Sequence, residues 1–232
     1  MRRRGITIAL LALSALFTLP ALAVAGDPKK PAPKPPVQKP PEHTPAKPVA
    51  KPEVKLGAEK LKPVSVGGEL DAALSLVDSA GKTVTIKETR GKIVVLHFWS
   101  MGNPAYDKRL AALNDEYSKK GVAFYAIAAN KGDIEDAKKL DEHAKKQGIT
   151  FQILLDKGAG LADKLGVANN THTIVLDAKG IVKYSGAVDD DPKGEKADKA
   201  APLLKNALES VIAGKNVAGA TNAVAGTPIT RK

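Results

Sequence analysis

The residues that could carry chemistry gather in two short segments, 97–103 and 169–173. His97 and Ser100 lie in the first, and Thr171, His172 and Thr173 lie in the second. A serine nucleophile needs a positioned base and an acidic residue that orients the base, and the sequence shows no such set. Two histidines could begin a metal site, but no third ligand accompanies them. The sequence therefore favours structural, hydrogen-bonded histidines, and it predicts no metal and no cofactor.

Cysteine is absent from all 232 residues. Thiolate nucleophiles and disulfide cross-links are therefore excluded for this chain. One further charged motif is the run Asp189-Asp190-Asp191-Pro192. Its oxygens lack the spacing of a known calcium loop. We interpret the run as a solvated turn, with weak calcium binding as the alternative.

The first 25 residues have the three parts of a secretory signal peptide. Residues 2–4 are arginines, residues 6–22 are mostly apolar, and residues 23–25 read Ala-Val-Ala, a small-x-small cleavage pattern. The alternative is a retained membrane anchor, but the apolar run is slightly short of the roughly 20 residues that a span needs. We therefore expect export to the periplasm, the envelope or the medium after cleavage near Ala25.

Composition separates a linker, a domain and a tail. Residues 27–63 hold 11 of the 16 prolines and nine lysines, with few large apolar side chains. Such a segment buries too little apolar surface to offset the entropy of ordering, so residues 26–63 are predicted to be a disordered linker. Residues 215–232 show no helical or strand period and predict a flexible tail. Residues 64–214 remain, which is enough for one domain with a sizeable core.

The positive charge is concentrated at the ends of the chain. Residues 1–63 carry 12 basic and four acidic groups, whereas residues 64–214 carry 21 of each. The domain therefore shows no basic excess of the kind that nucleic-acid binding requires. The lysine-rich linker, residues 27–63, could instead adhere to an anionic envelope surface.

Apolar runs and period-two patterns predict the elements of the domain. Strands are expected at residues 73–77, 83–86, 93–99, 122–128, 151–155, 173–176 and 181–184. A first helix is expected to begin at Asn103-Pro104, with Asn103 as N-cap, and further helices at residues 134–146, 160–165 and 203–212. This order predicts an α/β fold, with an N-terminal β-hairpin and a central mixed sheet covered by helices on both faces.

Four short motifs stand at characteristic places in this order of elements. They are Asp78-x-x-Gly81-Lys82, Gly91-Lys92 before a strand that ends in Phe98-Trp99, Leu176-Asp177-Ala178-Lys179-Gly180, and Gly186-x-Val188-Asp189-Asp190. Over roughly residues 68–214 the chain resembles the thioredoxin-like redoxins. The branch that it resembles includes the alkyl hydroperoxide reductase/thiol-specific antioxidant proteins and their peroxiredoxin-like relatives. The resemblance implies a thioredoxin-like fold with a redox thiol at the start of the first long helix, where the helix dipole stabilises a thiolate.

The resemblance also implies where sulfur should be. Aligned on Phe98-Trp99 and Pro104, the two redox cysteines of the family fall on Asn103 and Tyr106. The cis-proline that faces the redox site falls on Thr171, which we expect to be trans because a cis bond before a non-proline residue costs about 2.5–4 kcal/mol. A cysteine that some relatives carry in a C-terminal tail falls on Thr227. Every redox position is therefore replaced.

The polypeptide-binding cleft that the resemblance implies includes seven residues of this chain. They are Trp99, Met101, Asn103, Pro104, Asn170, Thr171 and His172. For Trp99 core packing is the favoured interpretation, and for Asn103 a plain N-cap role.

Three hypotheses about function follow from these observations. The first is an exported, non-catalytic redoxin that binds or scaffolds an unidentified protein or peptide client. The second is an envelope-associated structural factor that acts through its basic linker. The third is a redox role that is retained through a partner protein, which would keep the family's oxidoreductase or antioxidant function.

Overall fold

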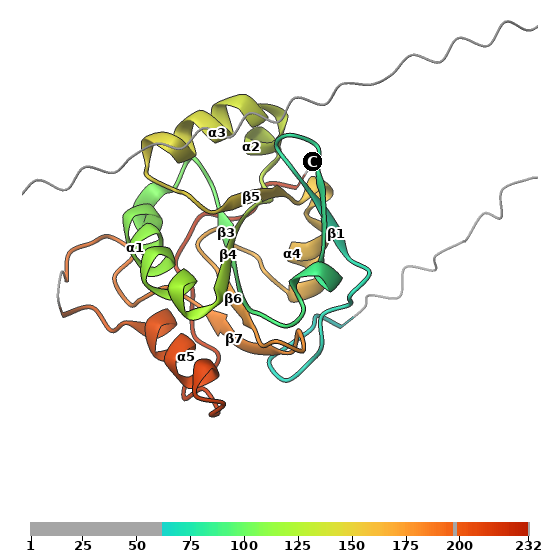
Figure 1. Cartoon of the computed structure of the whole chain (residues 1–232). Helices are drawn as coiled ribbons and strands as arrows, with labels where there is room; N and C mark the ends of the chain where they lie inside the picture. Colours follow the sequence, from blue (N-terminus) through green and yellow to red (C-terminus); the bar gives the residue numbers. More distant parts are fainter. Residues whose placement is uncertain (1–61, 197–198, 232) are drawn as a thin grey trace, which may run out of the picture. The chain divides into compact units, whose positions relative to one another are not determined.

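The computed structural model describes residues 62–196 and 199–231 (Figure 1). The expected signal peptide and nearly all of the expected linker lie outside the described residues. Within the described ranges, no helix is both long enough and apolar enough to cross a membrane.

Seven strands form one sheet in the order β2-β1-β5-β4-β3-β6-β7. They are β1 (Ser75–Asp78), β2 (Thr83–Thr85), β3 (Ile93–Trp99), β4 (Val122–Ala128), β5 (Gln152–Leu155), β6 (Thr173–Leu176) and β7 (Val182–Gly186). The central strands β3, β4 and β5 are parallel, and β1, β2, β6 and β7 pair antiparallel. This arrangement confirms the predicted mixed sheet and the N-terminal hairpin.

Five α-helices and four short 3₁₀ helices accompany the strands, and all but the last α-helix lie between two strands of the sequence. The α-helices are α1 (Asp107–Tyr117), α2 (Lys131–Glu135), α3 (Ala137–Lys146), α4 (Gly160–Leu165) and α5 (Leu203–Ile212). The 3₁₀ helices are η1 (Ile86–Thr89), η2 (Pro104–Tyr106), η3 (Ser118–Lys120) and η4 (Lys157–Ala159). These are the elements within the described residues.

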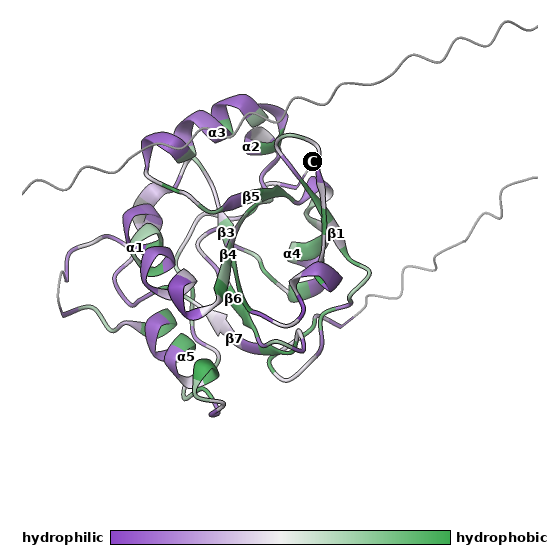
Figure 2. Cartoon of the chain, viewed as in Figure 1, coloured by the Kyte–Doolittle hydropathy of each residue, from purple (hydrophilic) through white to green (hydrophobic). Residues whose placement is uncertain are grey.

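Side chains alternate across the sheet, so each central strand contributes to both halves of the core. Along β3, Leu96 and Phe98 join the cluster that packs against α4, whereas Val95 joins the cluster under α1 and α5 and Trp99 the cluster under α3. Figure 2 shows the hydrophobic strands between helices whose outer surfaces are largely hydrophilic. Helices therefore cover both faces, as predicted.

Two predicted helices begin or continue differently in the structure. The chain first makes the 3₁₀ turn η2, and α1 begins at Asp107 instead of at Asn103. The single helix predicted for residues 134–146 is two helices that break at Asp136, where φ is −127° and ψ is 71°. The Asp136 carboxylate accepts the backbone N–H of Lys139 and so caps α3. A capping aspartate favours a new helix start over a continuous helix.

The C-terminal segment also differs from the predicted flexible tail. Thr221 bridges Ser185 in parallel, and Pro228 bridges Asn169 in antiparallel pairing. Ile229 is 5% exposed and belongs to the core cluster on the α4 side of the sheet. Main-chain pairing and one buried isoleucine hold the segment, and neither produces a helical or strand period in the sequence.

Candidate functional site

The position aligned with the first redox cysteine lies in the loop that follows β3. Asn103 occupies the N-cap position of η2, and Pro104 is the first residue of that turn. The backbone N–H of Asn103 donates to the Ser100 carbonyl at 3.1 Å, but the Asn103 side chain makes no capping hydrogen bond. Asn103 is partly buried and Pro104 is exposed. The aligned position therefore carries a carboxamide on a loop that solvent reaches.

Tyr106, aligned with the second redox cysteine, is a core residue. It is buried among the α1 and α5 side chains, and the Arg109 guanidinium lies 4.5 Å from its ring centroid. Burial, with a further contribution from the nearby Asp189 carboxylate, raises the pKa of the Tyr106 phenol to about 12. Tyr106 therefore stays neutral and serves packing at this place.

Trp99 is also a core residue in the structure. Its side chain is 1% exposed, and its indole N–H donates to Asp107 Oδ1 at 2.8 Å. Burial raises the pKa of the Asp107 carboxyl, and the Trp99 hydrogen bond acts in the opposite direction. Met101 is partly buried against the same apolar cluster. Trp99 is therefore not part of the predicted cleft, because a side chain inside the core cannot line an open surface.

The loop at residues 169–172, which precedes β6, also has buried residues at predicted cleft positions. Asn170 is 0% exposed and Thr171 is 2% exposed. Thr171 follows a trans peptide bond, as expected, but its φ is +72°. This left-handed conformation is rare for a β-branched residue, and it marks a locally rebuilt loop. The Thr171 hydroxyl donates to the carbonyl of Ala225 in the C-terminal segment.

A chain of polar side chains joins this loop to the ends of β3 and β4. Asn130 Nδ2 donates to Ser100 Oγ at 2.9 Å, and Asn170 Nδ2 lies 3.3 Å from Asn130 Oδ1. Asn170 Nδ2 also lies 3.2 Å from Thr227 Oγ1. Thr227 and the 169–172 loop are thus in contact, whereas Tyr106 belongs to a separate core cluster. Sequence reasoning missed Asn130, although its place just after a buried parallel strand was a usable signal.

The two predicted structural histidines have hydroxyl partners. His97 Nδ1 lies 2.8 Å from Thr173 Oγ1, and His172 Nε2 lies 2.9 Å from Ser185 Oγ. Burial lowers the pKa of His97 to about 3 and that of His172 to about 4. Both rings are therefore neutral at pH 7. In the part of the chain that the structure describes, no three His, Cys, Asp or Glu side chains are placed to hold a metal ion.

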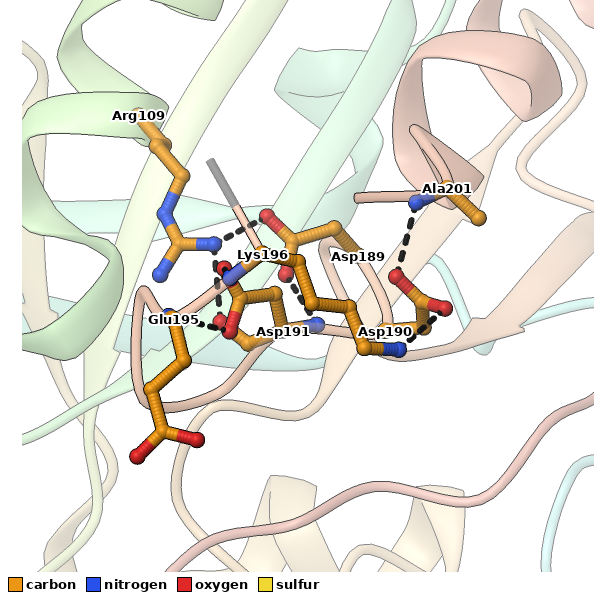
Figure 3. A network of polar contacts seen from close by, with 7 residues as sticks. All are labelled: Arg109, Asp189, Asp190, Asp191, Glu195, Lys196 and Ala201. Carbon is orange, nitrogen blue, oxygen red and sulfur yellow. Dashed lines mark hydrogen bonds and ion pairs between the residues drawn. The ribbon is translucent and has the colours of Figure 1, made fainter. Parts of the chain in front are cut away.

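The acidic run forms a hydrogen-bonded cluster instead of the solvated turn that the sequence suggests (Figure 3). Asp189 and Asp191 are buried, whereas Asp190 is exposed. Arg109 pairs with Asp189 and also donates to the Asp191 carbonyl at 2.9 Å. The Asp191 carboxylate accepts two backbone N–H groups, from Glu195 at 2.8 Å and Lys196 at 2.9 Å. Lys196 Nζ pairs with Asp190 and holds the pKa of that carboxyl below its usual value. Protein donors therefore occupy the oxygens that a calcium ion would need.

Comparison with solved structures supports the fold. A hypothetical protein from Sinorhizobium meliloti 1021 superposes with a TM-score of 0.64 and 24% identity, covering 73% of this chain and 96% of that one. An uncharacterized conserved protein from Geobacillus kaustophilus superposes with a TM-score of 0.61 and 18% identity, covering 74% and 94%. At these identities the likeness extends to the fold alone.

Sequence comparison identifies the family. Chloroplastic peroxiredoxin Q of Triticum aestivum is 33% identical over 125 residues, which cover 50% of this chain and 57% of that protein. Thiol-disulfide oxidoreductase ResA of Halalkalibacterium halodurans is 30% identical over 120 residues, covering 50% and 66%. The chain thus spans less than two thirds of either relative. Residues 68–185, which are just over half of the chain, match the AhpC/TSA family. With its thioredoxin-like α/β domain and no cysteine at the redox positions, the chain belongs to the AhpC/TSA family.

Proposed function

We propose that this protein is an exported, non-catalytic redoxin that acts by binding a polypeptide client. One observation carries the proposal: the family fold is complete, yet each aligned redox position holds a side chain without sulfur. Asn103 presents a carboxamide, Tyr106 is packed in the core, and Thr171 and Thr227 are engaged in hydrogen bonds around the 169–172 loop. Thiol–disulfide exchange and thiol-dependent peroxide reduction both need a thiolate, so binding is the activity that the retained fold supports.

Two redox assays on the full chain test the proposal. We expect no insulin-disulfide reduction and no peroxide consumption above the rate without protein. An Asn103→Cys chain is the matched positive control, because it restores one thiol at the aligned, solvent-reached position. With one equivalent of peroxide its thiolate is expected to be oxidised to a sulfenic acid, with release of water, and no turnover should follow, since no second cysteine resolves the oxidised form. Catalytic turnover by the cysteine-free chain alone would refute the proposal. Turnover only after addition of a thiol protein would instead favour a redox role through a partner.

A second candidate function rests on the uneven charge. The linker carries nine lysines against four acidic residues in residues 27–63, while the domain is balanced. Each lysine held near an anionic membrane surface contributes about 1 kcal/mol. We infer that the linker holds the exported domain at an anionic envelope surface, and binding through the domain is compatible with this role.

Deletion of residues 27–63 tests the linker in the chain that begins at residue 26, after the expected cleavage, and this chain is the full chain of the comparison. We expect the full chain to sediment with vesicles of anionic lipid at low salt and to dissociate at high salt, since salt screens the attraction. The deleted chain should remain in the supernatant under both conditions. A full chain in which the nine lysines are replaced by glutamine is the matched control, because it keeps the length and the prolines. Retention of either variant at the level of the full chain would contradict the electrostatic role.

A further inference from the structure

A hollow of about 290 Å³ lies at the end of the sheet where the parallel strand β3 begins. Ile93, the first residue of β3, lines the hollow, and so does Asp177, which directly follows β6. The predicted cleft positions lie at the other end of these two strands, since Trp99 is the last residue of β3. The seven residues of β3 place the two ends roughly 20 Å apart. The hollow is therefore a separate place from the cleft that the family resemblance implies.

Three lysines from three different elements line the hollow. They are Lys179, Lys183 and Lys215, and we call them the hollow lysines. None of them forms an ion pair with another residue in the described part of the chain. The Asp177 carboxylate also lines the hollow, but its Oδ1 accepts the backbone N–H groups of Lys179 at 2.9 Å and Ile181 at 3.0 Å. Three ammonium groups and one carboxylate leave a local excess of positive charge, although the domain as a whole is balanced.

The backbone that carries the hollow lysines is fixed by secondary structure. Lys215 follows the last turn of α5, and its N–H donates to the Ser210 carbonyl at 2.8 Å. Lys183 lies within β7, which pairs with β6. Lys179 belongs to the turn between these two strands, where its N–H donates to the Asp177 carboxylate. A ligand of the hollow therefore orders only side chains, and this lowers the entropic cost of binding.

The rest of the lining is partly apolar, and this limits what suits the hollow. Ile93 and Val211 line it together with Ala178 and Gly214. Ile212, next to Val211, is 38% exposed, and no other large hydrophobic side chain among the described residues is exposed. A phosphate ion or a flat layer of lipid headgroups leaves this apolar surface in water, whereas an aliphatic side chain buries it. The volume is at the lower limit of the roughly 300–1,000 Å³ of small-molecule sites, so it suits one or two side chains of a larger partner.

The chain's own acidic and flexible parts fit the hollow poorly. The linker carries nine lysines against four acidic residues in residues 27–63, so the hollow lysines repel it. A second copy would have to offer its acidic run, but Asp189 and Asp191 are buried in their own domain. Asp190 is exposed and already pairs with Lys196. These contacts favour an acidic partner other than this chain.

We propose that the hollow binds an acidic segment of another polypeptide, which places an aliphatic side chain over Ile93 and Val211 and carboxylates beside the hollow lysines. This inference deepens the proposed binding function and rests on it. The apolar anchor supplies affinity by filling a pocket, and the exposed charges supply specificity and a faster encounter. The client is thus held at the end of the sheet opposite the lost redox positions.

The test uses the chain that begins at residue 26 with its nine linker lysines replaced by glutamine, because the native linker would itself attract an acidic probe. The probe is the fluorescent peptide Glu-Glu-Leu-Leu-Glu-Glu. Replacement of all three hollow lysines by glutamine should weaken its binding at least about 10-fold, through the loss of three ion pairs. The matched control replaces three exposed lysines elsewhere in the domain and should change binding by less than about 2-fold. Its substitutions are Lys108→Gln, Lys157→Gln and Lys193→Gln.

Further probes separate the possible sources of the negative charge. The peptide Glu-Glu-Ser-Ser-Glu-Glu keeps the charge without the aliphatic anchor, and it should bind at least about 10-fold more weakly than the leucine peptide. Equal binding of the two peptides, or equal binding by the two triple variants, would overturn the proposal. Tighter binding of inorganic polyphosphate than of the leucine peptide would assign the hollow lysines to phosphate and overturn it too. Sedimentation of the glutamine-linker chain with vesicles of anionic lipid would assign them to a membrane, with the same consequence.

Backbone amide chemical shifts locate the bound peptide. We expect the leucine peptide to shift the amides of the hollow lysines and to leave those of Asn130 and Asn170, at the other end of the sheet, unchanged. Shifts confined to the loop at residues 169–172 would move the peptide to the predicted cleft and contradict the proposal. Both triple variants should keep the Tm of the parent chain, because the substituted side chains lie at the surface. These outcomes are independent of the redox assays, which alone decide whether the protein is catalytic.

Discussion

The free energy of unfolding is expected to fall by about 4 kcal/mol between pH 7.5 and pH 5, because two buried histidines cannot accept protons in the folded state. His97 and His172 have pKa values of about 3 and about 4 in the folded protein, against about 6.5 in an unfolded chain. As the pH falls below 6.5, the unfolded chain binds protons and the folded domain does not. Each histidine then removes about 1.4 kcal/mol of stability per pH unit, or about 2 kcal/mol at pH 5.

The sign of this effect follows from the direction of the shifts. Both pKa values are lowered, so the stabilisation is fully present above pH 6.5 and is lost on acidification, down to about pH 4 for His172 and about pH 3 for His97. Burial raises the pKa of Asp107 and of Asp156, and these carboxyls act in the opposite direction. Comparison of the unaltered chain with histidine variants isolates the histidine contribution, because the two carboxyls are common to all of them.

Urea unfolding at several pH values measures the effect. Replacement of His97 or His172 by glutamine, which keeps a hydrogen-bonding group for the hydroxyl partner, should remove about half of the pH dependence. The double replacement should remove nearly all of it between pH 6.5 and pH 5. The slope is the informative quantity, because each substitution also changes packing at every pH. A double variant with the slope of the unaltered chain would contradict the assignment.

Loss of Arg109 is the second change with a large expected effect. Its guanidinium pairs with the Asp189 carboxylate, whose side chain is 8% exposed, and lies against the Tyr106 ring. Replacing Arg109 by methionine leaves a buried carboxylate without this cation. Breaking a buried ion pair costs roughly 3–5 kcal/mol, and the partial exposure of Arg109 places this pair near the lower end. We expect a loss of about 3 kcal/mol and a Tm lower by roughly 6–12 °C.

Two companion variants separate the ion pair from other effects. Lys108→Met removes a positive charge from the exposed neighbouring position of α1, and it should change the free energy of unfolding by less than about 0.5 kcal/mol. Asp189→Asn in the Arg109→Met background removes the unpaired charge and should recover part of the loss. Denaturant unfolding of the unaltered chain, Arg109→Met, Asp189→Asn and the double variant gives the coupling energy. A loss below about 1 kcal/mol for Arg109→Met alone would show that the stability of the acidic cluster at residues 189–191 does not depend on this ion pair.

The sequence predicted the interior of the fold well because the signals there are local. The bounds of β3 and β4 agree with the predicted strands at residues 93–99 and 122–128, since an unbroken apolar run suits a strand buried on both faces. The predicted bounds of α4 and α5 agree as well. Their apolar residues recur at helical spacing, and the chain needs no distant contact to specify them.

The site was less predictable because distant contacts decide it. Asn130 and Thr230 are joined by a hydrogen bond across 100 positions of sequence, and nothing near either residue indicates the other. Ile229 stands alone among polar and small neighbours, so its burial left no periodic trace. The acidic run also looked solvated, since the arginine that pairs with it lies 80 positions earlier. Local sequence patterns predict helices and strands, whereas these distant contacts depend on how the helices and strands pack together.

The contact between Thr221 and Ser185, where the C-terminal segment first meets the sheet, has a consequence for association between molecules. The strand β7 is at one end of the sheet, and an open strand edge can pair with the edge of another molecule. Here the Ser185 N–H donates to the Ala220 carbonyl at 2.9 Å, and the Asn222 N–H donates to the Ser185 carbonyl at 3.3 Å. The Asn222 side chain continues the cover by accepting the Ala187 N–H at 2.8 Å. Residues 220–222 therefore shield this end of the sheet from edge-to-edge aggregation.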